Sequence, residues 1–203
     1  MDDFLHRPVA EAGMRIGLFG GSFNPAHDGH RLVALQCLKR LALDRVWVMV
    51  SPGNPLKDHS ELAPLADRVA ATRARMDHPQ LDVTAFEASH NFRYTYETLA
   101  HLVAAEPAVR FVWIMGADSL MTFDRWERWE QIADTMPIAV YARPGATFRA
   151  TRSRAAVSLE AFRIPEDKAP ILAESEPPAW VYLRGVMSSQ SSTAIRKVRA
   201  SSL

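Results

Sequence analysis

RIGLFGGSFNPAHDGH, residues 15–30, is the stretch that decides the fold of this chain. Its apolar start, Arg15 to Phe19, is typical of a strand, and a pattern of helical period begins at Asp28. The glycines between them let the backbone come close to a ligand, and the amides at a helix start attract anions. His27 and His30 are one helical turn apart and would point to the same place. The stretch therefore predicts a strand, a phosphate-binding turn and a helix.

Short apolar runs alternate with longer stretches of helical period along most of the chain. The predicted strands are 15–19, 45–50, 81–85, 109–115, 138–142 and 180–183, and the predicted helices are 28–43, 65–76, 94–105, 126–133 and 192–201. This alternation predicts an α/β fold, a Rossmann-like, doubly wound parallel sheet with helices on both faces. Ligands bind at the carboxyl ends of the strands in such sheets, so the segments at Gly20, Pro52, Gly116 and Arg143 should converge on one edge.

We expect the 203 residues to form a single domain, long enough to bury a core. Residues 1–13 precede the first predicted strand as an N-terminal extension. Between residues 144 and 178 the alternation weakens into mixed basic, acidic and proline-containing sequence. We interpret this part as a variable excursion with a helix near 154–162.

The composition is that of an ordinary soluble protein. Lys and Arg number 24 against 23 Asp and Glu, and the net charge of +1 gives no sequence-independent grip on nucleic acid. The first residues lack the features of a signal peptide, and no stretch reaches the roughly 18 apolar residues of a membrane span. Cys37 lies in an apolar helical stripe and is expected to be a buried thiol. We therefore expect a cytoplasmic protein that binds neither membrane nor nucleic acid.

The histidine pair has two other interpretations, a zinc site and two solvated histidines at a helix start. Zinc needs three or four ligands, usually further Cys or His at short spacing, and the sequence has none nearby. The glycine pair is neither the nucleotide loop ending in Gly-Lys-Ser/Thr nor the three-glycine dinucleotide fingerprint. The residues favour phosphate chemistry on another type of loop, and we assign no metal ligand.

Residues 20–25, GGSFNP, followed by residues 27–30, HDGH, resemble the signature of the nucleotidyltransferase superfamily that carries His-x-Gly-His. Within it, the chain is most similar to the bacterial nicotinate-nucleotide adenylyltransferases. The resemblance implies a nucleotidyltransferase-type fold and transfer of AMP from ATP to nicotinate mononucleotide in NAD biosynthesis. The products would be nicotinate adenine dinucleotide (deamido-NAD) and pyrophosphate. It also implies ATP as co-substrate and Mg²⁺ carried with ATP.

Two further segments support this narrower resemblance. Residues 116–120, GADSL, resemble the family segment whose aspartate, Asp118 here, contacts the ATP ribose, although a turn with Asp118 as a helix cap is an alternative. Trp126 matches a tryptophan that stacks on the pyridine ring in the family, whereas a tryptophan at a helix start is more often part of a core.

Residues 190–196, QSSTAIR, resemble the family's Ile-Ser-Ser-Thr-x-Ile-Arg, in which hydroxyls cap a helix and the arginine binds phosphate. A plain N-cap with a surface arginine is the alternative. Gln190 departs from the usual Ile, which affects the packing expected around adenine.

Shorter matches at residues 52–57, PGNPLK, at Thr95 and at Arg143 resemble the family's acceptor-side loops, but each could equally be a turn, a cap or a surface charge. The resemblance thus assigns catalysis to His27, His30 and Arg196. It assigns ATP binding to Gly20, Gly21, Ser22, Phe23, His27, His30, Gly116, Asp118, Ser191, Ser192, Thr193, Ile195 and Arg196. It assigns nicotinate mononucleotide binding to Asn54, Lys57, Thr95, Trp126 and Arg143.

Two alternative functions and the oligomeric state stay open at this level. Another member of the superfamily, such as a pantetheine-phosphate adenylyltransferase or a cytidylyltransferase, commonly carries Asp in place of Asn24 and lacks the segment from Gly116 to Trp126. A catalytically silent nucleotide-sensing module would have lost a motif histidine or Arg196, and this chain has lost neither. The oligomeric state is not fixed by the sequence, and a homo-oligomer is one option.

Overall fold

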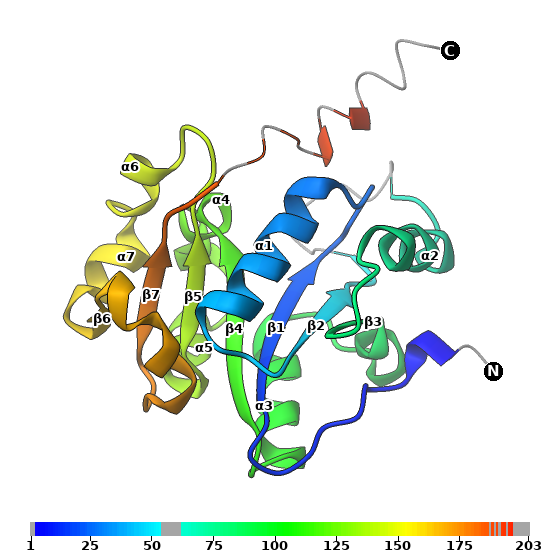
Figure 1. Ribbon diagram of the computed structural model, residues 1–203, viewed down its shortest axis with the longest axis horizontal. Coiled ribbons are helices and arrows are strands. Elements are labelled where there is room, and N and C mark those ends of the chain that lie inside the picture. The colour runs from blue at the N-terminus through cyan, green and yellow to red at the C-terminus, as the bar shows by residue number, and fades with distance from the viewer. Residues whose placement is uncertain are drawn as a thin grey trace.

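The computed structural model describes residues 3–53, 62–186, 188, 190, 192, 193, 195 and 196. These residues form a parallel seven-stranded sheet with the order β3-β2-β1-β4-β5-β7-β6 (Figure 1). The strands are β1 (Arg15–Gly21), β2 (Arg45–Val50), β3 (Leu81–Thr84), β4 (Arg110–Gly116), β5 (Ile138–Tyr141), β6 (Arg163–Ile164) and β7 (Trp180–Leu183). The α-helices are α1 (Asp28–Arg40), α2 (Leu65–Arg75), α3 (Thr95–Ala105), α4 (Ala117–Leu120), α5 (Trp129–Thr135), α6 (Thr147–Ala150) and α7 (Arg154–Ser158). The 3-10 helices are η1 (Asp3–Leu5), η2 (Phe86–His90), η3 (Phe123–Arg125), η4 (Glu160–Phe162) and η5 (Glu166–Glu174).

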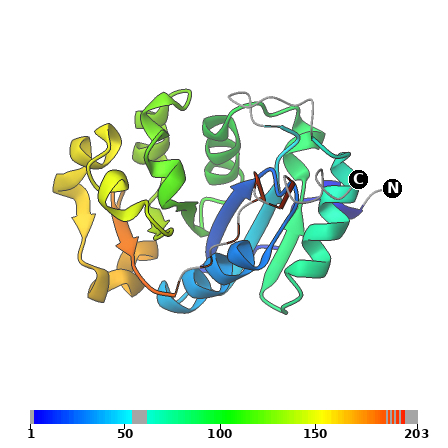
Figure 2. The same ribbon diagram turned by 90° about the horizontal axis from the view of Figure 1, so that it is seen from above.

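Helices cover both faces of the sheet, as the sequence predicts (Figure 2). Side chains alternate between the faces of a strand, so each face of the sheet builds its own core. On one face, α3 and α5 pack on alternate residues of β1 such as Ile16 and Leu18. On the other face, α1 and α2 pack on β2, which contributes alternate residues such as Val46 and Val48, and η5 packs on β4 and β7. The expected doubly wound α/β architecture is thereby confirmed.

The strand ends bring the predicted ligand segments to one edge of the sheet. The last residue pair between β1 and β2 is Gly21 with Val50. The last pair between β4 and β5 is Gly116 with Tyr141. The loops that follow these strands therefore start at the same edge. In Figure 1 the arrowheads point to this edge, and the described residues beyond β7 run across it.

Several boundaries differ from the sequence-based prediction. β1 continues to Gly21, where we had expected it to end at Phe19, and α1 ends at Arg40, not at residue 43. The helix expected over 126–133 begins only at Trp129, because Arg128 adopts a left-handed conformation (φ 53°) that separates it from η3. Of the helix expected over 192–201, the structure describes four residues, and they are helical.

The excursion between residues 144 and 178 contains more structure than expected. The helix predicted near 154–162 is α7 followed by η4. The two-residue strand β6 and the nine-residue η5 were not predicted. η5 contains Pro170, which removes a helical hydrogen-bond donor and hides the element from a periodicity search.

Cys37 belongs to α1 and is fully buried in the core. Burial raises the pKa of its thiol to about 12, so it is a packing residue. Among the described residues, no helix has the length and apolar character needed to cross a bilayer.

Candidate active site

Two pockets open at the carboxyl edge of the sheet and share a wall. The first has a volume of about 320 Å³ and the second of about 330 Å³. The wall comes from the ends of β1 and β4 and from the segments after them. It consists of Gly20, Gly21, Ser22, Trp113, Ser119 and Trp126. Ligands in the two pockets would therefore be neighbours.

The turn between β1 and α1 lines the first pocket and is tightly packed. A Cβ on Gly20 would lie 2.6 Å from Cη2 of Trp113, so only glycine lets the strand pass the indole. Phe23 is 2% exposed and adopts a left-handed backbone (φ 45°), which costs a non-glycine residue energy. Its ring packs edge-on against Phe19 and His30, at centroid distances of 5.6 and 4.9 Å. These contacts hold the strained turn in place.

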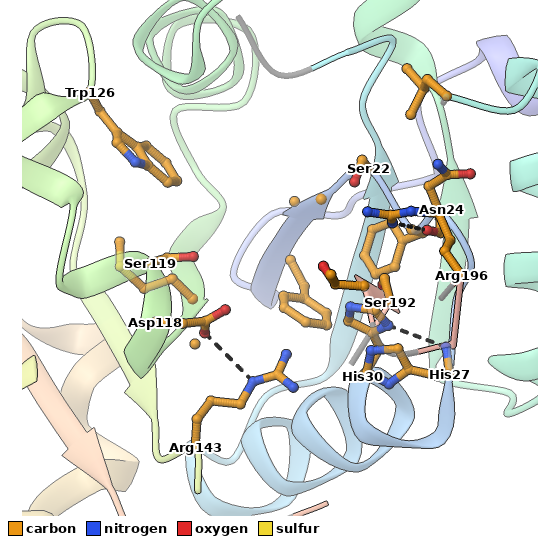
Figure 3. A pocket seen from close by; sticks show the side chains of 18 of the residues that line it. Ser22, Asn24, His27, His30, Asp118, Ser119, Trp126, Arg143, Ser192 and Arg196 are labelled. Carbon is orange, nitrogen blue, oxygen red and sulfur yellow. Dashed lines mark hydrogen bonds and ion pairs between the residues drawn. The ribbon is translucent and has the colours of Figure 1, made fainter. Parts of the chain in front are cut away.

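His27 and His30 stack, with ring centroids 3.7 Å apart and 29° between the planes (Figure 3). The backbone N–H of His27 donates to Nδ1 of His30 at 3.2 Å. Because Nδ1 accepts this hydrogen bond, a neutral His30 ring carries its proton on Nε2. Nε2 of such a ring is a donor, and His30 lines the first pocket.

His27 is neutral at physiological pH. Its side chain is 3% exposed, and burial lowers its pKa to about 4, with the nearby cations Arg143 and Arg75 lowering it further. Among the described residues, its buried Nδ1 has no hydrogen-bond partner. His27 therefore acts in this pocket as a polar ring without charge.

Gly29, inside the HDGH motif, makes room for the His27 imidazole. A Cβ on Gly29 would lie 2.9 Å from Nδ1 of His27 and 3.0 Å from its Cε1. Both distances are far below ordinary van der Waals contact, so a larger residue would push the imidazole out of place. The glycine of this motif is explained by a side-chain contact, since no left-handed conformation is recorded for it.

One amide at the start of α1 is already engaged. The N–H of Asp28 donates to Oε1 of Gln190 at 3.0 Å, and Oδ1 of Asp28 accepts from Arg75 at 2.9 Å. We had expected the amides at this helix start to be available to an anion, and for Asp28 this is wrong. Gln190, which departs from the family pattern, here caps the helix from a distant part of the chain.

The segment after β7 returns to the turn that follows β1. Arg196 donates from Nη1 to the carbonyl of Asn24 at 2.6 Å, and the hydroxyl of Ser192 donates to the carbonyl of Pro25 at 3.0 Å (Figure 3). Arg196, Ser192 and Thr193 all line the first pocket. A guanidinium is thereby held beside the histidine pair.

Across the first pocket from the histidines, Asp118 and Arg143 face one another (Figure 3). Oδ1 of Asp118 lies 3.6 Å from Nε of Arg143. A Cβ on Gly116 would collide with the same Asp118 oxygen, so a larger residue where β4 ends would displace the Asp118 carboxylate. Asp118 is in the first turn of α4, and no hydrogen bond from its side chain caps that helix. The cap interpretation of Asp118 is therefore wrong.

The second pocket is aromatic on one side. Trp126 is half-buried and packs edge-on against Trp113 and Phe123, with centroids 6.3 and 5.4 Å away. Tyr94 and Thr95, at the start of α3, line the same pocket. The side chain of Glu97 accepts from the N–H of Tyr94 at 2.9 Å and fixes that helix start. The pocket thus offers a flat ring beside polar groups.

The structure brings most of the expected site residues into these pockets. The first is lined by Gly20, Gly21, Ser22, Phe23, His27, His30, Gly116, Asp118, Ser192, Thr193 and Arg196 from the expected ATP set. Ile195 is half-buried and lines neither pocket. From the expected mononucleotide set, Thr95 and Trp126 line the second pocket, while Arg143 lines the first. Asn54, Lys57 and Ser191 lie outside the described residues.

Two residues at the site were not found by sequence reasoning. Trp113 forms part of the shared wall, but in the sequence it is simply one apolar residue of a buried strand. Arg68 is 3% exposed beneath the loops at the end of β1 and β2. Its position on the apolar face of α2, with Leu65, Val69 and Thr72, is a signal that could have revealed it, since charged residues seldom occupy such positions.

Acidic groups are sparse in the first pocket. Asp118 is the carboxylate among its lining residues, and the described part of the chain has no group of three or more His, Cys, Asp or Glu that could hold a metal ion. A metal in this pocket would therefore need most of its ligands from a bound molecule.

The chain is similar to known proteins over nearly its whole length. It matches the cytidylyltransferase-like family over residues 18–198. It is 55% identical over 191 residues to a probable nicotinate-nucleotide adenylyltransferase of Mesorhizobium japonicum, covering 94% of this chain and 98% of the relative. A protein of the same name from Methylorubrum extorquens is 56% identical over 183 residues, covering 90% of this chain and 99% of the relative.

Solved structures share the fold at lower sequence identity. The nicotinic acid mononucleotide adenylyltransferase of Plasmodium falciparum, complexed with NaAD, has a TM-score of 0.67 and 17% identity. The match covers 91% of this chain and 83% of that one.

The low pKa of His27 predicts an acid-dependent loss of stability. Folding lowers this pKa from 6.5 to about 4, so the unfolded chain binds a proton more readily than the folded one. The contribution of the neutral ring is complete above pH 6.5 and is lost as the pH falls from 6.5 toward 4. Urea unfolding between pH 7 and 4 should show a steeper loss for the wild type than for His27→Asn. An NMR titration that gives His27 an ordinary pKa would contradict this prediction.

Proposed function

Because the chain belongs to the nicotinate-nucleotide adenylyltransferase family, within the cytidylyltransferase-like proteins, we propose that it transfers AMP from ATP to nicotinate mononucleotide. The products are nicotinate adenine dinucleotide and pyrophosphate, and the reaction belongs to NAD biosynthesis. The observation that carries the proposal is the pair of pockets with a common wall, one polar and basic, the other aromatic.

In this proposal the two nucleotides meet at the shared wall. ATP occupies the first pocket with its phosphates toward His27, His30 and Arg196. Nicotinate mononucleotide occupies the second pocket with its pyridine ring on Trp126 and its polar groups near Thr95. Its phosphate then reaches past the wall into the first pocket, where Arg143 lies, which accounts for an acceptor-side arginine in the pocket for ATP.

The reaction is a direct displacement. An oxygen of the mononucleotide phosphate forms a bond to the α-phosphorus of ATP, and the bond from that phosphorus to the bridging oxygen of pyrophosphate breaks. No side-chain nucleophile is needed, so the protein contributes by holding two anions together and by stabilising the charge on the transferred group.

The residues of the first pocket suit these tasks. Nε2–H of His30 is the donor to a phosphate oxygen, and the guanidinium of Arg196 offsets negative charge. His27 stacks under His30 and fixes its orientation, and its backbone N–H fixes its tautomer. Asp118, at the end of β4, is placed to accept hydrogen bonds from a ribose. Mg²⁺ that enters with ATP would neutralise phosphate charge, with Asp118 as the carboxylate within reach of the pocket.

A direct test compares acceptors. The purified protein is incubated with ATP, Mg²⁺ and nicotinate mononucleotide, nicotinamide mononucleotide or phosphopantetheine, and pyrophosphate release and product are measured. We expect release to depend on nicotinate mononucleotide. Faster turnover with phosphopantetheine than with either pyridine nucleotide would reject the proposed acceptor.

His30→Ala should lower kcat by about 10²- to 10³-fold, the usual effect of removing one preorganised donor to a developing charge. His6→Ala is the control, since His6 is exposed and lines neither pocket. Thermal melting should stay near the wild-type value, because His30 lies at a ligand-binding edge. A variant that loses stability without a separate defect in kcat would restore a structural interpretation of the pair.

Trp126→Ala should raise the KM for nicotinate mononucleotide far more than the KM for ATP. Stacking on an aromatic side chain contributes about 1–3 kcal/mol, roughly 5- to 150-fold in affinity. Trp129→Ala is the matched control: Trp129 is 9% exposed in the core, so its loss should cost about 3–5 kcal/mol of stability. Titration with each nucleotide and a denaturant melt separate the two effects. Unchanged mononucleotide affinity in folded Trp126→Ala would place the pyridine elsewhere.

A further inference from the structure

Arg68 is a buried arginine whose hydrogen bonds all go to backbone carbonyls. Its Nε donates to Ala63 at 2.9 Å, its Nη1 to Ser22 at 2.8 Å and Ser51 at 2.7 Å, and its Nη2 to Pro52 at 3.1 Å. One guanidinium thus holds three separate segments of the chain. They are the turn after β1, the loop after β2 and the residues that precede α2.

The carbonyls held by Arg68 belong to the walls of the pockets. Ser22 lines both pockets, and Ser51 and Pro52 line the second. At this edge β1 and β2 have parted after the last ladder contact, from the N–H of Ser51 to the carbonyl of Gly21 at 2.9 Å. Arg68 satisfies the carbonyls just beyond that point, where no strand partner is left.

The same guanidinium connects to the residues that hold Arg196. The N–H of Ala63 donates to Oδ1 of Asn24 at 3.3 Å, and the carbonyl of Asn24 accepts from Arg196. Figure 3 shows Asn24 beside Arg196, and both residues line the first pocket. A displacement of the Arg68 side chain would therefore move residues that line both pockets.

The positive charge of Arg68 is not offset by a carboxylate among the described residues. Its acceptors carry only partial charges, and burial lowers the pKa of the guanidinium. A buried cation without a counter-ion is costly and is retained where geometry requires it. Lysine could not replace it, since an ammonium is a point donor and lacks the planar fork that reaches four carbonyls.

We propose that Arg68 is a positioning residue that fixes the wall between the two pockets, so that the acceptor phosphate and the α-phosphorus of ATP are held at reacting distance. This inference rests on the proposed function. Arg68 touches neither nucleotide in this arrangement and acts through the carbonyls of Ser22, Ser51 and Pro52.

The test compares Arg68→Lys with Arg45→Lys. Arg45 also uses its fork, on Asp82 and the carbonyl of Pro79, but at the first residue of β2, away from both pockets. We expect Arg68→Lys to lower kcat by about 10- to 100-fold, the effect of a displacement on the order of 1 Å, and to raise both KM values. Arg45→Lys should leave kcat and KM within about twofold. Equal kinetic effects of the two variants, or an Arg68→Lys variant that loses stability alone, would reject the positioning role.

Two further measurements keep the proposal open to rejection. Amide exchange should become faster in residues 20–24 and 51–53 of Arg68→Lys but not of Arg45→Lys. In Arg68→Ala, guanidinium ion at low concentration should restore activity and ammonium ion should not. Equal rescue by both ions, or rescue by neither, would reject a role for the planar guanidinium of Arg68. If Arg68→Lys does not fold, Arg68→Gln replaces it.

A wild-type protein that forms no dinucleotide would reject the proposed function and leave Arg68 testable. Calorimetric titration of the wild type and Arg68→Lys with ATP alone then gives the readout. Weaker ATP binding in Arg68→Lys with unchanged binding in Arg45→Lys supports the positioning role, and equal binding in all three rejects it.

Discussion

Parallel pairing in register is the constraint on which the site depends. β1 lies between β2 and β4, and its pairing extends to Phe19 on the β4 side and to Gly21 on the β2 side, so the loops after these strands start near one another. Peptide groups beyond the last ladder contact have no strand partner and must find one elsewhere. Arg68 supplies donors to those after β1 and β2, and Arg196 supplies one to Asn24. The pocket walls are thus held by arginines that bind backbone, in addition to the sheet itself.

The electrostatics of the site combine a histidine that burial keeps neutral with several arginines. His27 is kept neutral by burial, and His30 has its tautomer fixed by a backbone N–H. Arg143 lies beside the carboxylate of Asp118, and Arg196 donates to the carbonyl of Asn24. Arg68 donates to backbone carbonyls such as that of Ser22. A site built in this way can accept two phosphorylated ligands without a large cluster of positive charge.

The sequence predicts the helices and strands in which apolar residues recur with a regular period. The six longer strands and the helices on both faces follow from alternation of apolar runs, and the placement of Gly20 and Gly116 at strand ends follows with them. The break before α5 could not be predicted, because an arginine has no preference for the left-handed conformation that Arg128 adopts. β6 is too short to show a pattern. Arg68 and Trp113 have roles that depend on contacts between loops distant in sequence, as does the cap that Gln190 provides to α1.

The contact between Arg196 and Asn24 spans 172 positions of the chain, and the one between Gln190 and Asp28 spans 162. During synthesis the N-terminal part of a domain emerges first, so the glycine turn and the histidine pair exist long before their partners do. The first pocket is therefore completed only after β7 and the segment that follows it have been synthesised. A nascent chain that has completed its sheet as far as β5 would carry the HDGH motif without the guanidinium of Arg196 beside it.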